Sequence, residues 1–159
     1  MKQKELSNTL IVICCAIAVG LLAACIVGLP NLGKTIVSEN PTLSYMELPC
    51  LIYIWIAALP VFAALYIAVK ICLRIGEDNS FCNDNAVGLK NIGRIFFAES
   101  IYFFIGAIAM AVMQILYLTV FIVFALAVII SLAASVAAFV MSHLTYKAYL
   151  LKRDSELTI

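Results

Sequence analysis

Three long apolar runs constrain this chain more than any other feature of its sequence. Residues 10–29 and 51–69 contain no charged side chain, and residues 95–142 contain Glu99 as their only one. About 20 apolar residues in a helix span the roughly 30 Å hydrocarbon core of a bilayer, so each of the first two runs predicts one crossing. The third run would form a helix about 72 Å long. That is too long for one crossing, so the run predicts two helices that turn near residues 114–119.

The composition agrees with a membrane protein. Of the residues, 65% are hydrophobic and 12% are charged, whereas charged residues make up about a quarter of a soluble domain. The sequence therefore predicts an all-α integral membrane protein, a four-transmembrane-helix bundle that forms one domain over residues 1–159. The net charge of +1 and the scattered basic residues argue against direct contact with nucleic acid. The expected segments are about 8–29, 50–73, 95–114 and 119–146.

The basic residues also predict an orientation. Nine of the ten Lys and Arg residues fall on one side of a four-segment topology, and only Lys34 falls on the other. Cytoplasmic loops carry an excess of Lys and Arg, so both termini and the polar break at residues 74–94 are expected in the cytoplasm. The protein is therefore expected in the inner (plasma) membrane, with its helices in contact with the lipid bilayer. Residues 30–49, rich in Pro, Asn, Gly and Ser, are expected to form a loop on the opposite side.

Small residues recur at every third or fourth position in two of the segments. Such spacing lets two helix backbones approach closely in lipid, so each stripe is expected to pack against another helix. The sequence leaves open whether that helix belongs to the same chain or to another subunit of a homo-oligomer. The stripes are Ala16, Gly20, Ala24 and Gly28 in the first segment, and Ser131, Ser135, Ala138 and Ser142 in the fourth.

Residues 22–25 allow a second interpretation of the first segment. They resemble the cleavage site of a lipoprotein, which would attach lipid to Cys25. The apolar run does not stop at Cys25 but continues to Leu29, so a transmembrane helix is the preferred interpretation.

The polar break predicts an amphipathic helix at about residues 82–94. At 100° per residue its apolar side chains share one face. A helix of this kind is expected to lie at the membrane surface and to continue into the third segment, with an interfacial position between segments two and three. Its polar face is either a solvated connector or a docking surface. That face carries Asn83, Asp84, Lys90, Asn91 and Arg94.

Glu99 is the one charge inside an apolar run. Asn85 and Ile92 precede it at intervals of seven residues, so a continuous helix directs both Asn85 and Glu99 into the bundle. A carboxylate inside the membrane edge is costly, which predicts either an ion pair that locks the bundle or a proton or ligand site at a water-filled cavity. Lys70 and His143 are expected at a similar depth. The sequence therefore predicts an intramembrane polar cluster of Lys70, Asn85, Glu99 and His143.

Residue patterns that would carry a reaction are missing from the sequence. One histidine beside one carboxylate does not supply the three protein ligands of a catalytic zinc site. The six cysteines contain no C-x-x-C pair, and there is no Ser/His/Asp arrangement or phosphate-binding glycine loop. The sequence therefore predicts a protein that is not an enzyme, with no catalytic residue, no metal and no cofactor.

Two strings of residues resemble a known family. IGEDNSFCNDNA followed by LKNIG, within residues 75–93, and the ending SELTI are similar to the pattern of small bacterial four-helix membrane proteins called domain of unknown function 2975. Cys82 stands where that family commonly has Ser, which changes how the loop helix is capped. Members are often encoded beside a small helix-turn-helix regulator, so the resemblance implies a membrane partner that holds or releases a transcription factor.

Two functions are therefore expected as alternatives. The first is a membrane partner or sensor whose cytoplasmic loop helix and C-terminal tail dock a cytosolic helix-turn-helix transcriptional regulator. The second is a small-molecule or ion transporter, or a lipid-binding sensor, in which the polar cluster around Glu99 lines a cavity open to the cytoplasm.

Overall fold

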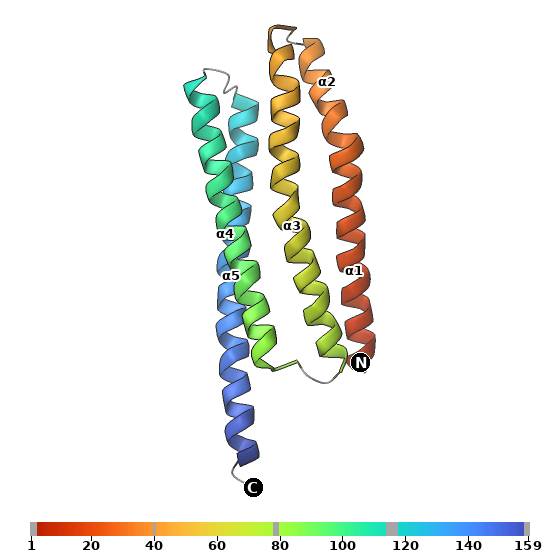
Figure 1. Ribbon diagram of the computed structural model, residues 1–159, viewed down its shortest axis with the longest axis vertical. Coiled ribbons are helices and arrows are strands. Elements are labelled where there is room, and N and C mark those ends of the chain that lie inside the picture. The colour runs from red at the N-terminus through yellow and green to blue at the C-terminus, as the bar shows by residue number, and fades with distance from the viewer. Residues whose placement is uncertain (1–2, 40, 78–79, 114–117, 158–159) are drawn as a thin grey trace.

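The computed structural model describes residues 3–39, 41–77, 80–113 and 118–157, and nearly all of them are helical (Figure 1). Four stretches are long and apolar enough to cross a membrane: Lys4–Thr35, Ser44–Gly76, Asn83–Val112 and Val120–Ser155. The described residues contain no strand, so the predicted all-α fold with four membrane-spanning helices is confirmed. In chain order the elements are α1 (Gln3–Ala23), a π-helical stretch η1 (Ala24–Gly28), α2 (Leu29–Glu39), a 3₁₀-helix η2 (Pro41–Met46), α3 (Glu47–Gly76), α4 (Asn83–Val112) and α5 (Leu118–Leu157).

The four long helices pack through small side chains. Each of them contacts the next one along the row α1, α3, α4 and α5. Large apolar side chains such as Phe104 and Leu126 point outward, where lipid surrounds the protein. Lipid is as apolar as these side chains, so the helices associate instead through close backbone contacts and interhelical hydrogen bonds. The buried small residues include Ser7, Ala57, Ala64, Ala86, Ser100, Ser131, Ser135 and Ala138.

The predicted loop over residues 30–49 is wrong, because α1 continues through η1 into α2 as far as Glu39. Pro30 has no backbone N–H and cannot extend an ordinary α-helical hydrogen-bond ladder. In the π-helical stretch the Leu29 N–H donates to the Ala24 carbonyl instead, which leaves the Cys25 carbonyl to another donor. Trp55 on α3 supplies it, since its Nε1 donates to the Cys25 oxygen at 3.0 Å. The helical segment therefore continues through Pro30, and the polar residues of α2 extend it beyond the apolar run 10–29.

The small-residue stripe on the first segment does not pack within this chain along most of its length, so its packing against a second subunit stays a prediction. Ala16, Gly20 and Ala24 are exposed, and a Cβ built on Gly20 meets nothing within 4 Å. A different face of α1 turns toward α3, because the Ser7 Oγ donates to the Cys72 carbonyl at 2.6 Å. Within the chain, the face of α1 that carries Ser7 therefore packs on α3, and the face that carries the small-residue stripe does not.

The corresponding prediction for the fourth segment is confirmed. The α5 stripe faces α4, where Ser135 and Ser142 are buried. Ser135 Oγ donates to the Gly93 carbonyl at 2.9 Å, and Ser142 Oγ donates to the Ala86 carbonyl at 2.7 Å. These two bonds, two turns apart, fix α5 to the first half of α4.

The expected loop helix at residues 82–94 is the first three turns of α4 and continues without a break into the third segment. It begins near the end of α3 and packs against α3 and α5 (Figure 1). Since Ser142 lies level with Ala86, α5 extends about 16 Å past the start of α4, counted from Tyr146 to Leu157. The last turns of α5 therefore project beyond the other helices (Figure 1).

Candidate functional site

Two grooves flank the first turns of α4 at one end of the molecule. This end, called the basic end below, holds the start of α1, the end of α3, the start of α4 and the end of α5 (Figure 1). The α3–α4 groove has a volume of about 260 Å³ and the α4–α5 groove about 420 Å³. Val87 lines both of them. The two grooves are therefore separated by one ridge of α4.

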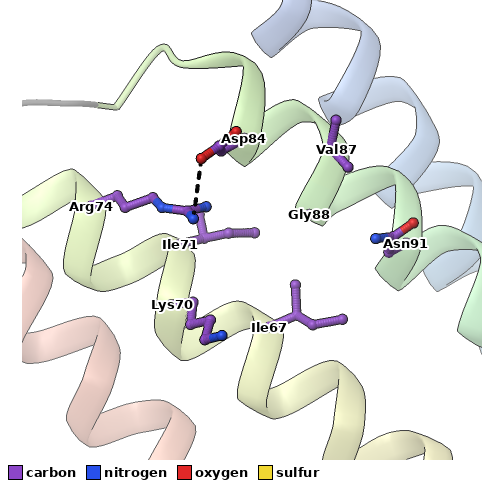
Figure 2. A pocket seen from close by; sticks show the side chains of 8 residues that line it. All are labelled: Ile67, Lys70, Ile71, Arg74, Asp84, Val87, Gly88 and Asn91. Atoms are coloured by element: carbon purple, nitrogen blue, oxygen red, sulfur yellow. Dashed lines mark ion pairs between the residues drawn. The ribbon is translucent and has the colours of Figure 1, made fainter.

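The α3–α4 groove combines charged and apolar side chains (Figure 2). At its rim, the Arg74 Nη2 and the Asp84 Oδ2 form an ion pair at 3.3 Å. Lys70 lies one turn before Arg74, and its Nζ is 4.6 Å from the centre of the Tyr66 ring. Gly88 lets α4 approach α3 closely, because a Cβ at this position would lie 3.1 Å from Ile71 Cδ1. The other lining residues are Ile67, Val87 and Asn91.

The α4–α5 groove is larger and carries aromatic side chains. Phe139 packs against Gly93, where an added Cβ would lie 3.1 Å from the Phe139 ring. His143 and Tyr146 line the groove from α5, and both are exposed. The α4 residues on its other wall are Asn83, Ala86, Val87 and Lys90.

The five predicted docking residues divide between these two grooves. Asn83 and Lys90 line the α4–α5 groove, and Asp84 and Asn91 line the α3–α4 groove. Arg94 is exposed and lines neither. Each pair is seven residues apart, so its members share one side of the helix, while a step of one residue turns the side chain by about 100°. The polar face predicted from the sequence is thus divided between the α3–α4 groove and the α4–α5 groove.

The predicted polar cluster is not brought together as one site. Lys70 lines the α3–α4 groove and His143 lines the α4–α5 groove, whereas Glu99 lines neither. Asn85, whose Nδ2 donates to the Ser80 carbonyl at 3.0 Å, lies about 21 Å before Glu99 along α4. The inward direction predicted for Asn85 and Glu99 does occur, since they are only 1% and 4% exposed.

Glu99 is buried without an ion-pair partner among the described residues. Within this part of the chain, its Oε1 also has no hydrogen-bond partner. The phenol rings of Tyr53 and Tyr102 lie near its carboxyl group. Neither of the sequence-predicted partners, Lys70 and His143, is paired with it. The expected bundle-locking ion pair is therefore not formed.

A pair of tyrosines, missed in the sequence, joins α3 and α4 beside Glu99. The Tyr53 hydroxyl donates to the Tyr102 carbonyl at 2.5 Å, and the Tyr102 hydroxyl donates to the Tyr53 carbonyl at 3.0 Å. Their rings stack with centroids 4.3 Å apart. Gly106 makes room for this tyrosine clasp, because an added Cβ would lie 2.6 Å from Tyr53 Cζ. The two tyrosines are 49 residues apart, so no local sequence pattern links them.

No group of three or more His, Cys, Asp or Glu side chains is placed to hold a metal ion within the described ranges. The basic end instead presents two grooves that are lined by both polar and apolar side chains, one between α3 and α4 and one between α4 and α5.

The comparison with known proteins agrees with the resemblance found in the sequence. The model of the protein family of unknown function DUF2975 matches residues 31–159. The chain belongs to this family. This DUF2975 protein is similar to the uncharacterized membrane protein YoaS of Bacillus subtilis (strain 168), with 28% identity over 150 residues that cover 90% of this chain and 91% of YoaS. No solved structure is significantly similar to it.

Proposed function

We propose that this DUF2975 protein is a non-enzymatic membrane partner that docks a cytosolic protein on the α4–α5 groove and the projecting end of α5. The partner proposed is the small helix-turn-helix regulator that the family resemblance implies. The observation that carries the proposal is the groove of about 420 Å³ beside a helix end that projects past its neighbours. A cytosolic protein can reach this surface without entering the membrane, provided that the basic end faces the cytoplasm.

The chemistry of the groove supports a protein partner. Aromatic residues are enriched at the centres of protein interfaces, and Tyr and Arg are frequent anchors there. Tyr146 and Phe139 offer apolar ring surface, while Lys90 and His143 offer hydrogen-bond donors at the rim. Tyr149 lies beside Tyr146, with ring centroids 6.4 Å apart, and continues the aromatic surface along α5.

The proposal includes an orientation with both termini in the cytoplasm of a cell whose inner membrane holds the protein. The excess of Lys and Arg at the basic end supports it. Reporter fusions at the C-terminus check the orientation independently of any partner. Green fluorescent protein should fluoresce there and alkaline phosphatase should be inactive, and the reverse result would overturn this part of the proposal.

Co-purification of a small helix-turn-helix regulator with the full-length protein tests the docking surface. Lys90→Glu should weaken binding about tenfold, because it replaces a hydrogen-bond donor at the rim of the groove by a charge of the opposite sign. Lys34→Glu is the matched charge reversal, since Lys34 is exposed on α2 at the opposite end, and it should leave binding within about twofold.

A second matched pair compares the two sides of α4. Asn83→Ala removes an amide from the α4–α5 groove, and Asn91→Ala removes the same group from the α3–α4 groove. Only Asn83→Ala should weaken regulator binding. If both Lys90→Glu and Asn83→Ala bind the regulator as the wild type does, the α4–α5 groove is not the docking surface.

Transport of a small molecule or ion is the second candidate function, and buried Glu99 is the observation that favours it. Intramembrane carboxylates commonly mark ion or substrate pathways. We rank it second because both grooves end short of Glu99. Ion flux through the protein in liposomes, lost in a folded Glu99→Gln variant, would reverse this ranking.

A further inference from the structure

The α3–α4 groove lies at the level of the lipid headgroups. Lys70 is the first residue after the apolar run 51–69, which at 1.5 Å per residue matches the hydrocarbon thickness. On α4 the groove residues 84–91 come just before the apolar run that begins at Ile95. The groove therefore begins where the hydrocarbon ends, and it extends toward the water at the Arg74–Asp84 pair.

The groove carries a net positive charge and has unused hydrogen-bond donors. Its ionisable side chains are Lys70, Arg74 and Asp84, which together give a charge of +1. Arg74 is bound to Asp84 through one nitrogen, and a guanidinium group has five N–H donors, so others can serve a second acceptor. No carboxylate lies within ion-pair distance of Lys70 in the described part of the chain. Its Nζ rests on the Tyr66 ring, beside the groove.

The remaining lining fits the part of a lipid next to its headgroup. Ile67, Ile71 and Val87 are apolar (Figure 2), and Asn91 carries an amide beside Ile67 and Gly88. At about 260 Å³ the groove is slightly smaller than the roughly 300–1,000 Å³ of most small-molecule pockets. It has room for a phosphate headgroup, while acyl chains would leave it sideways along the exposed apolar face of α3.

We propose that the α3–α4 groove binds the phosphate headgroup of an acidic phospholipid, with Lys70, Arg74 and Asn91 as the donors. Basic pockets between transmembrane helices recognise anionic headgroups in this way. The two grooves share Val87, but the proposed lipid donors do not line the α4–α5 groove, so the two proposals can be tested with different substitutions. A bound lipid would bridge α3 and α4 at the basic end.

Native mass spectrometry of the full-length protein in a non-ionic detergent tests the proposal with two lipids of equal chain length. Dioleoyl phosphatidylglycerol should bind more tightly than dioleoyl phosphatidylcholine. Each basic residue near a membrane surface is worth about 1 kcal/mol toward an anionic lipid, which equals about fivefold in affinity. Lys70→Gln should therefore lower the affinity for phosphatidylglycerol about fivefold. Lys34→Gln, the same change at the opposite end, should leave it unchanged.

Asp84→Asn provides a test in the opposite direction. It removes a negative charge from the rim and releases Arg74, so phosphatidylglycerol should bind several-fold more tightly. A gain in affinity cannot result from misfolding. A decrease, or equal binding of the two lipids by the wild type, would overturn the proposal.

Two further results would also overturn it. Inorganic phosphate that displaces phosphatidylglycerol at equal concentration would identify a site for a soluble anion. If Lys70→Gln changes regulator binding and leaves lipid binding unchanged, the groove belongs to the protein partner.

Discussion

Replacing Glu99 by Gln distinguishes a bundle-locking carboxylate from one that is buried without a partner. Glu99 is 4% exposed, and its Oε1 has no hydrogen-bond partner among the described residues. Gln has nearly the same shape and no charge, so the substitution preserves packing while it removes any ion pair. We expect the Glu99→Gln protein to be about as stable as the wild type.

A paired Glu99 and an unpaired Glu99 predict measurably different changes in the Tm on substitution by Gln. Breaking a buried ion pair costs about 3–5 kcal/mol, because it leaves one charge unpaired. For a chain of this length, 1 kcal/mol shifts the Tm by roughly 2–4 °C. A locked pair would therefore lower the Tm by about 6–20 °C. The structure, in which no pair is formed, predicts a change of less than about 4 °C.

Thermal unfolding in detergent, followed by the fluorescence of the single tryptophan, provides the assay. Trp55 is bonded to the Cys25 carbonyl, so its emission reports the contact between η1 and α3. Glu5→Gln is the control, since Glu5 is an exposed carboxylate at the start of α1. A loss of 6 °C or more for Glu99→Gln alone would show that Glu99 has a charged partner, and the present account of the α3–α4 contact would be wrong.

Three further predictions concern local contacts. Tyr53→Phe and Tyr102→Phe each keep the stacked ring and remove one interhelical hydrogen bond, so each should lower the unfolding free energy by about 0.6 kcal/mol. A double-mutant cycle should show that the two losses are coupled. Strictly additive losses would argue against a joint clasp. Gly106→Ala places a Cβ against the Tyr53 phenol and should destabilise by about 1–3 kcal/mol, whereas Gly20→Ala, which meets nothing, should not destabilise in the same thermal assay. Cys82 precedes α4 without a side-chain cap, so Cys82→Ser should raise the unfolding free energy by about 0.5–1 kcal/mol, and an unchanged Tm would mean that the serine finds no free N–H.

The four membrane-spanning helices could be predicted because they depend on the length of apolar runs, which can be counted directly in the sequence. Apolar length alone decides how many helices cross the bilayer, and the runs 10–29, 51–69 and 95–142 gave four. The burial of Asn85 and Glu99 followed from helical spacing for the same reason. The end of α2 at Glu39 could not be predicted, because a π-helical stretch before Pro30 depends on a donor from another helix.

Contacts between helices were predictable only in part. Small-residue spacing marks faces that are able to pack, and α5 uses its stripe while α1 leaves three of its four small residues exposed. The choice depends on which side chains find carbonyl partners across the boundary, such as Ser7 on Cys72. The tyrosine clasp belongs to the same class, since it joins residues far apart in sequence. A single sequence without its relatives contains no signal for such pairs.

Side-chain hydrogen bonds join the four long helices in pairs at the basic end. There α5 is fixed to α4 by Ser135 and Ser142, and α1 is fixed to α3 by Ser7. At this end an ion pair also joins α3 to α4, between Arg74 and Asp84; it is partly exposed, and exposed ion pairs contribute about 0–1 kcal/mol. The tyrosine clasp holds the same two helices farther along. A lipid in the α3–α4 groove would contact α3 and α4 where the Arg74–Asp84 pair is exposed, and α4 also forms one wall of the groove proposed for the regulator.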